Sequence, residues 1–139
     1  METKFNFNSQ ICTTREQSER LLALGLKKVT ADMFYAYYKD RIGYDWYLVP
    51  RPATFGDKRS IPAWSLDRLI EMMPLDVFDY CFTLIKNYPN GYSVEYDDSS
   101  YYYKENIYDT IIEGIEHLIK KGHFNKEYLV WKRKAKFRK

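Results

Sequence analysis

A wide apolar stripe between residues 104 and 121 constrains the fold of this chain more strongly than any other pattern in the sequence. At 100° per residue, a helix over these residues places its apolar side chains on one continuous face, with Asp109, Glu113 and Glu116 opposite. The apolar face consists of Ile107, Tyr108, Ile111, Ile112, Ile115, Leu118 and Ile119. A face this wide is buried against a sheet or another helix, so we expect this helix, which ends at Gly122, to be the main helix of the core.

The segment before this helix predicts a β-hairpin near residues 80–96. Large apolar side chains alternate with other residues along both arms, which is typical of strands in a sheet. Between the arms, Pro89 presets φ for a turn and Gly91 allows a positive φ. In the first arm, Cys81 stands beside Phe82, and we expect it to be a small buried thiol.

A capping box marks the start of a helix near the N-terminus. The box is formed either by Thr13 with Glu16 or, one residue later, by Thr14 with Gln17. In both cases the first side chain accepts a bond from a free backbone N–H of the first turn, and the second reaches back. Gly25 is the expected end of this helix, because glycine adopts the left-handed conformation that closes many helices.

The next segment changes character from helical to extended. Thr30 is a candidate cap for a shorter second helix that runs through Met33. Residues 34–38 and 44–49 are aromatic and β-branched, and they favour strands. The two helices around Gly25 superficially resemble a helix-turn-helix over residues 17–34, but the second one offers no Arg or Asn to read bases. We therefore favour an ordinary corner between helices over a DNA reader.

Two further signals complete the order of elements. Arg51–Ser60 contains proline, glycine and charged residues and predicts an exposed loop. Ser65 predicts the cap of a helix over Leu66–Met73, which Pro74 stops.

The order of helices, strands and helix predicts an α+β fold. We expect a small antiparallel sheet with a hairpin near residues 80–96, packed by the long helix at about 104–121 and by short N-terminal helices. The length fits one domain, which we place at residues 1–130, followed by a basic and flexible tail at 131–139.

The net positive charge of the protein comes from that tail. The formal net charge is +3, yet the tail alone has six cations and no acid, so the remainder has 16 basic and 19 acidic residues. Cations interleaved with aromatic rings can neutralise phosphates and stack on bases. The candidate nucleic-acid-binding residues are Trp131, Lys132, Arg133, Lys134, Lys136, Phe137, Arg138 and Lys139. The favoured alternative is that the charges of this tail only keep the protein soluble.

Composition points to a cytoplasmic protein that does not enter a membrane. Two cysteines at unrelated positions indicate a reducing compartment rather than a disulfide framework. The N-terminal residues lack the apolar run of a signal peptide, and no stretch approaches the roughly 20 apolar residues of a membrane span.

We predict no catalytic, cofactor-binding or metal-binding residue, which favours a non-enzymatic protein. Asp109, Glu113 and His117 lie on neighbouring turns of the long helix, but on the face away from the apolar stripe, where a solvated surface is the simpler interpretation. A helix N-terminus next to Cys12 could lower its pKa, yet nothing joins it or Cys81 to a histidine. A small-molecule enzyme is the third alternative, and it would need a deep pocket lined by ionisable groups.

Tyrosine is the strongest deviation in composition, with 14 of 139 residues. Tyrosine tolerates half-burial and is enriched where proteins meet partners, so some of this aromatic surface is expected at an interface with another protein or a second copy. The candidate partner-binding residues are Tyr35, Tyr37, Tyr38, Tyr44, Trp46, Tyr47, Tyr101, Tyr102 and Tyr103.

Several segments of the sequence also carry a family resemblance. They are residues 12–26 (CTTREQSERLLALGL), 30–33 (TADM), 61–66 (IPAWSL), 69–74 (LIEMMP), 106–109 (NIYD) and 124–129 (FNKEYL). The chain over most of residues 5–129 resembles a family of small bacterial proteins associated with prophages and other mobile elements. That family has no assigned activity, so the resemblance implies one domain in a bacterial cytoplasm and no site residues. The leading hypothesis is an accessory protein that binds a protein partner or itself, and the alternative is nucleic-acid binding through the tail.

Overall fold

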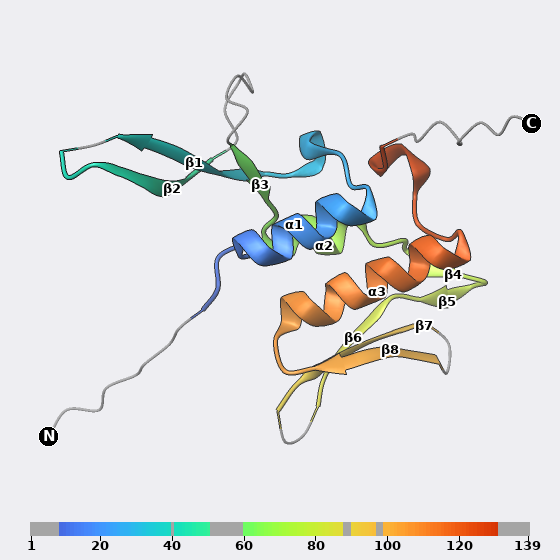
Figure 1. Cartoon of the computed structure of the whole chain (residues 1–139). Helices are drawn as coiled ribbons and strands as arrows, with labels where there is room; N and C mark the ends of the chain where they lie inside the picture. The colour runs from blue at the N-terminus through green and yellow to red at the C-terminus, as the bar shows by residue number, and fades with distance from the viewer. Residues whose placement is uncertain (1–8, 40, 51–59, 88–89, 97–98, 131–139) are drawn as a thin grey trace, which may run out of the picture.

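In the computed structural model of this chain, the α-helices of the described residues lie between two three-stranded antiparallel sheets (Figure 1). The structure describes residues 9–39, 41–50, 60–87, 90–96 and 99–130, with the backbone alone at 38–39 and 99–103. The helices are α1 (Arg15–Leu24), α2 (Leu66–Met72) and α3 (Ile107–Lys121), with the 3₁₀ turns η1 (Lys28–Thr30) and η2 (Lys126–Tyr128). The strands are β1 (Met33–Lys39), β2 (Tyr44–Pro50), β3 (Ile61–Ala63), β4 (Asp76–Val77), β5 (Tyr80–Cys81), β6 (Thr83–Lys86), β7 (Tyr92–Tyr96) and β8 (Ser99–Lys104). The α+β class is confirmed.

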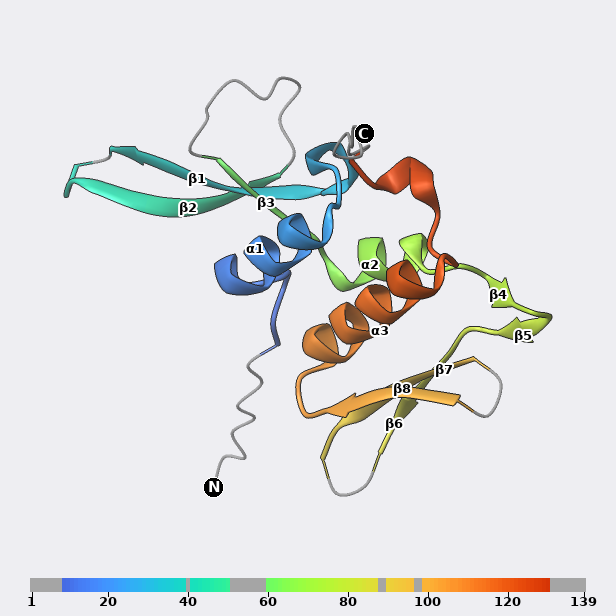
Figure 2. The ribbon, with the colours of Figure 1, turned by 45° about the vertical axis from the view of Figure 1, so that its right-hand side comes forward.

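Helix α3 forms the centre of the core, as its apolar stripe predicts. It packs along β7 and β8 (Figure 2), and four of its aliphatic side chains have no exposed surface. These are Ile111, Ile112, Ile115 and Leu118. The helix begins at Ile107 rather than near Lys104, because the preceding residues form β8 and Asn106 caps the first turn, accepting from two backbone N–H groups. Gly122, with φ 78°, ends the helix as expected.

The predicted hairpin forms, but its first arm is shorter than the alternation suggests. β6 pairs with β7 so that Leu84 lies opposite Val94, and β8 adds a third strand. Tyr80 and Cys81 instead pair with β4 in a separate small hairpin, and the Phe82 N–H donates to the Leu75 carbonyl 3.0 Å away. The prediction of a buried Cys81 is therefore wrong: its strand turns out of the main sheet and the residue is exposed.

Helix α1 uses the later of the two capping boxes. The Thr14 side chain accepts from the Gln17 N–H, and the Gln17 side chain accepts from the Thr14 N–H. Thr13 is fully buried instead, and its hydroxyl oxygen accepts from the Trp64 N–H at 3.1 Å. Gly25 closes the helix in the left-handed conformation, with φ 105°.

The second helix predicted after Gly25 does not form, so residues 17–34 are not a helix-turn-helix. Only the 3₁₀ turn η1 follows, and strand β1 begins at Met33. Thr30 ends the turn rather than capping a helix, because its hydroxyl donates to the Lys27 carbonyl at 2.6 Å and accepts from the Trp64 indole N–H at 2.9 Å. A buried indole N–H needs such an acceptor, and this tertiary contact outweighs the local capping preference.

The aromatic segments pair as a hairpin that projects from the body (Figure 1). β1 and β2 are antiparallel over their whole length, and β3 joins the other side of β1. Strand β3 was not predicted, since Pro62 stands in its centre. Helix α2 begins at its predicted Ser65 cap and ends at Met72, one residue earlier than predicted.

Some predictions concern parts of the chain outside the described residues. They include most of the loop at Arg51–Ser60 and the whole basic tail at 131–139. In the part of the chain that the structure does describe, no helix combines the length and apolar character needed to cross a bilayer.

Candidate functional site

One face of the β1–β2 hairpin carries three neighbouring aromatic rings, Tyr37, Tyr44 and Trp46, which we call the aromatic face. In the antiparallel register Tyr37 lies opposite Trp46, and Lys39 lies opposite Tyr44. Because side chains alternate along a strand and opposite residues share a face, these three rings belong to the same side of the hairpin.

The three rings are in direct contact. The Tyr37 ring stacks on Tyr44 at a centroid distance of 5.5 Å and an interplanar angle of 17°. It also meets Trp46 at 5.0 Å with the rings tilted by 50°. The guanidinium of Arg15, from the first turn of α1, lies 4.9 Å from the centroid of the Trp46 ring. These ring–ring and cation–π contacts hold the rings of the aromatic face in defined positions.

The outer part of the aromatic face is open to solvent. The hairpin extends beyond the helices (Figures 1 and 2). Tyr44 keeps 58% of its surface exposed, and Ile42 at the hairpin tip keeps 96%. An exposed ring next to an exposed aliphatic side chain is typical of surfaces that bind other proteins.

The edge of strand β2 is less suited to binding than its face. The Trp46 N–H donates to the Asp45 carboxylate at 2.7 Å, and Pro50 has no N–H. A charge and a proline on an edge strand are common ways of preventing the addition of another strand. The side chains of the hairpin, rather than its backbone edge, are therefore the surface that is suited to binding.

Tyr35 lies at the base of the hairpin, and its hydroxyl makes its contacts inside the protein. Its hydroxyl donates to the Thr13 carbonyl at 2.8 Å and lies 3.7 Å from the Cys12 sulfur. Burial raises the pKa of Tyr35 and also the pKa of Cys12. The lowered pKa considered for Cys12 is therefore wrong, since the buried thiol meets desolvation rather than a free helix terminus.

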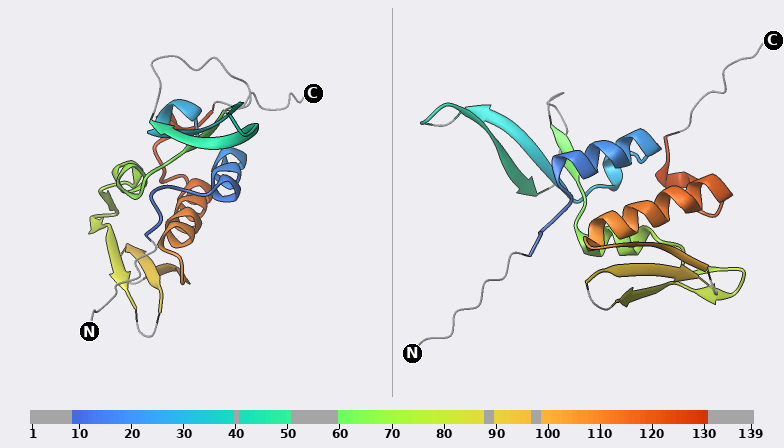
Figure 3. Two further views of the ribbon diagram at one scale, coloured as in Figure 1. Left: turned by 90° about the vertical axis from the view of Figure 1, so that its left-hand side faces the viewer. Right: turned by 60° about the horizontal axis from the view of Figure 1, so that its bottom comes forward.

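The other predicted partner-binding residues do not join this surface as one group. Tyr47 alternates with Trp46 and so belongs to the opposite side of the hairpin. The side chain of Tyr38, like those of residues 101–103, lies outside the described part of the structure. Strand β8, which contains residues 101–103, belongs to the sheet on the far side of the helices (Figure 3). The fold thus places the tyrosines of β1 and β2 in one sheet and those of residues 101–103 in another.

The carboxylates of α3 join two helices and are not simply a solvated face, which corrects the sequence interpretation. Arg20 of α1 binds Glu116 at 2.8 Å and Glu113 at 3.1 Å. Asp109 accepts from the Gln17 side chain at 2.7 Å. Among the described residues, no group of three His, Cys, Asp or Glu side chains is arranged to hold a metal.

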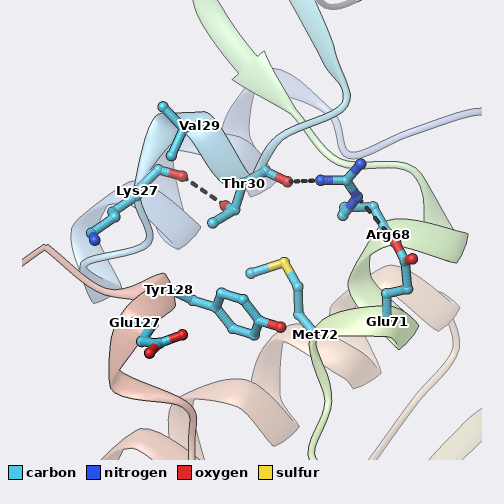
Figure 4. A pocket seen from close by; sticks show the side chains of 8 residues that line it. All are labelled: Lys27, Val29, Thr30, Arg68, Glu71, Met72, Glu127 and Tyr128. Carbon is cyan, nitrogen blue, oxygen red and sulfur yellow. Dashed lines mark hydrogen bonds and ion pairs between the residues drawn. The ribbon is translucent and has the colours of Figure 1, made fainter.

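A second surface feature, a pocket of about 500 Å³, lies between η1, α2 and η2 (Figure 4). We call it the η1–η2 pocket and define it by Lys27, Arg68, Glu71, Met72 and Tyr128 among its lining residues. The Arg68 guanidinium donates to the Thr30 carbonyl at 2.9 Å and pairs with Glu71 at 3.2 Å. Among the described residues, its lining holds no histidine or cysteine.

This pocket could not be predicted from the sequence, because the pairing that forms it joins residues about 100 positions apart. Leu26 pairs with Leu129, the Lys27 N–H donates to the Tyr128 carbonyl at 2.9 Å, and the Val130 N–H donates to the Gly25 carbonyl at 2.6 Å. An isolated bridge of this kind has no periodic pattern in the sequence.

No protein-family model matches the chain, and no curated protein or solved structure is significantly similar to it. The resemblance to proteins of mobile elements therefore stays a prediction.

Proposed function

We propose that the protein is a non-enzymatic interaction module that binds a protein partner, in the first instance a second copy of itself, through the aromatic face of the β1–β2 hairpin. The observation that carries the proposal is the contact series Arg15–Trp46–Tyr37–Tyr44, which ends in a largely exposed tyrosine.

Two physical arguments support a role in binding. Tyrosine, tryptophan and arginine are the residues that most often dominate the binding energy of interfaces. The rings already contact one another, so binding immobilises few additional side-chain rotamers, and each such loss would cost about 0.5–1.5 kcal/mol.

Sedimentation velocity over a concentration series tests the self-association version. The test variant is Ile42→Ser with Tyr44→Ser, which removes the exposed end of the aromatic face. The matched control is Leu75→Ser with Phe78→Ser, because these two residues are also apolar and exposed and lie on either side of strand β4. We expect the wild-type protein and the control to associate with rising concentration, and the test variant to remain a monomer.

A heterologous partner is tested with the same proteins as bait. If the wild-type protein is monomeric, we expect it and the control to retain a binding partner that the test variant loses. Equal behaviour of the two variants in both experiments would contradict the proposal.

The proposed cellular location and source of the protein are inferred from the sequence. The cysteine usage supports a cytoplasmic location, and the family resemblance supports a bacterial mobile element as the source.

A further inference from the structure

The η1–η2 pocket is a feature of the described surface that the proposed function does not use. Its volume of about 500 Å³ lies within the range of roughly 300–1,000 Å³ that is usual for cavities that hold small molecules. Such cavities combine apolar lining with a few polar groups that fix the orientation of a ligand. The η1–η2 pocket has both, and the arrangement of its charges indicates which ligand it fits.

The floor of the pocket is apolar. The Tyr128 ring lies beside Met72, which has only 3% of its surface exposed (Figure 4). Phe124 contacts the Tyr128 ring edge-on, with ring centroids 5.9 Å apart, and so supports it. Val29 adds a half-exposed aliphatic side chain to the lining. An aromatic side chain of a ligand would bury apolar surface here and pack against the ring of Tyr128.

One wall of the pocket carries charges that already neutralise each other. The Arg68 guanidinium pairs with Glu71 at 3.2 Å and donates to the Thr30 carbonyl at 2.9 Å. The Thr30 hydroxyl is also used inside the protein, since it donates to the Lys27 carbonyl and accepts from the Trp64 indole. These groups therefore shape the wall rather than select the charge of a ligand.

Two opposite charges on the other side of the floor are left for a ligand. Figure 4 shows Lys27 and Glu127 on the side of Met72 that lies away from Arg68. Neither the Lys27 ammonium nor the Glu127 carboxylate forms an ion pair with another described residue, although both line the pocket. The backbone holds the two turns together, because the Lys27 N–H donates to the Tyr128 carbonyl at 2.9 Å. A ligand that carries one charge of each sign can bind both groups at once.

We infer that the η1–η2 pocket binds a free α-amino acid with an aromatic side chain. The carboxylate of the amino acid pairs with Lys27, its ammonium pairs with Glu127, and its ring packs against Tyr128 and Met72. A residue inside a peptide chain has neither of these two charges, whereas the free amino acid has both. The pocket lining has two cations and two carboxylates, so a ligand with a single charge gains no net attraction from the four groups together.

The experiment is an NMR titration of the ¹⁵N-labelled full chain with L-phenylalanine. We expect saturable shifts of the backbone amide signals of residues 27–30, 68–72 and 126–129. L-phenylalaninamide lacks the carboxylate and N-acetyl-L-phenylalanine lacks the ammonium, so each tests one ionic contact. Each analogue is expected to bind about tenfold more weakly, which corresponds to the loss of one hydrogen bond to a charged group. Glycine keeps both charges but has no side chain to bury, and we expect it to bind about 10- to 150-fold more weakly.

Substitutions in the protein test the same two contacts. Lys27→Gln and Glu127→Gln are each expected to weaken phenylalanine binding about tenfold. Their matched controls are Lys28→Gln, which changes an exposed lysine of η1 outside the pocket lining, and Glu19→Gln, which changes an exposed glutamate of α1. We expect both controls, and Lys27→Arg, which keeps the charge, to bind phenylalanine like the wild-type protein. The dispersion of the amide signals shows directly that each variant is folded.

Three outcomes would overturn the inference. They are no saturable shift at the pocket with phenylalanine, equal affinity for phenylalanine and either of its two analogues, and equal losses for Lys27→Gln and Lys28→Gln. The proposed role of the aromatic face is independent of this result, because Ile42→Ser with Tyr44→Ser is expected to leave phenylalanine binding unchanged.

Discussion

The two three-stranded sheets of this protein are both antiparallel and rich in tyrosine, yet they use tyrosine differently. Tyr96 in β7 has 1% of its surface exposed beneath α3, and its hydroxyl donates to the Pro74 carbonyl at 2.6 Å. Tyr44 in β2 remains mostly exposed and contacts another ring of its own hairpin. The same residue type is therefore part of the core at Tyr96 and part of the surface at Tyr44.

The difference follows from the length and pattern of the covering helix. Helix α3 has 15 residues with an aliphatic stripe along its whole length, and it packs against both β7 and β8. Helix α1 has 10 residues and packs chiefly on β3 and α3, so the outer half of the β1–β2 hairpin extends past it. Tyrosine content alone does not distinguish a buried tyrosine from an exposed one, whereas the presence of a covering helix does.

The largest expected effect comes from truncating the core of the covered sheet. Ile115→Ala should lower the free energy of unfolding by about 2–5 kcal/mol, because it removes buried methyl groups and leaves a cavity. Tyr44→Ala should cost at most about 1.5 kcal/mol, since it removes one ring contact at an exposed position. Urea denaturation followed by circular dichroism measures both.

The ratio of these two losses in unfolding free energy tests whether the two sheets differ as described. If Tyr44→Ala destabilises the protein as much as Ile115→Ala, the hairpin is part of the core and its rings are not held ready for a partner. A small cost, together with loss of association in the same variant, would separate the binding role from stability.

A smaller and opposite effect is expected at Gly114, in the middle of α3. A Cβ atom built there lies 3.6 Å from Val94 and 3.7 Å from Met73, which is ordinary contact. Gly114→Ala should therefore stabilise the protein by about 0.5–1 kcal/mol through helix propensity. Gly25→Ala is the matched control: it should destabilise, because φ there is 105°. A destabilised Gly114→Ala would mean that the helix and the covered sheet have no room for one methyl group.

Local patterns in the sequence predicted much of the covered half of the molecule, but not strand β8 or the small β4–β5 hairpin. The stripe of α3 predicts a helix that must be buried, and the alternation around Val94 predicts the strand beneath it. The two strands of the β1–β2 hairpin were also predicted, since aromatic residues on both sides of Gly43 favour strands, but their pairing was not. These signals succeed because each one lies within a single element or two adjacent ones.

The candidate site could be predicted only in part, because it depends on contacts between distant segments. The sequence identified Tyr37, Tyr44 and Trp46, but not Arg15, which reaches the hairpin from a helix that precedes it. Thr30 shows the same limit, since its hydroxyl binds Trp64 instead of capping a helix. Such choices are decided by which buried donor needs an acceptor, and that is known only once the chain is folded.

A modest effect is expected where the two halves meet, at the ion pairs between α1 and α3. Arg20→Met should cost about 0.2–1 kcal/mol at neutral pH, since the groups are partly exposed. Hydrogen bonding to Arg20 lowers the pKa of Glu116 below its ordinary 4.5, so this stabilisation is present above that pH and is lost as the pH falls through the folded-state pKa. Denaturation at several pH values should show the difference from wild type disappearing in acid. A constant difference would mean that Arg20 acts through packing, and Arg41→Met, on the hairpin, should have no effect at any pH.

The smallest effect concerns the rate at which the two thiols react, and it tests whether the two halves open together. Exposed Cys81 should react with iodoacetamide at once, whereas Cys12 is buried with a raised pKa and should react only when its surroundings open. In a Cys81→Ser variant, mass spectrometry gives the rate for Cys12 and hence the free energy of that opening. Cys12 contacts Tyr35 at the base of the projecting hairpin, so an opening free energy well below that of global unfolding would mean that this side opens alone. Equal values would mean that the covered sheet and the base of the hairpin form one cooperative unit, in which only the outer hairpin with Tyr44 is left free to adapt to a partner.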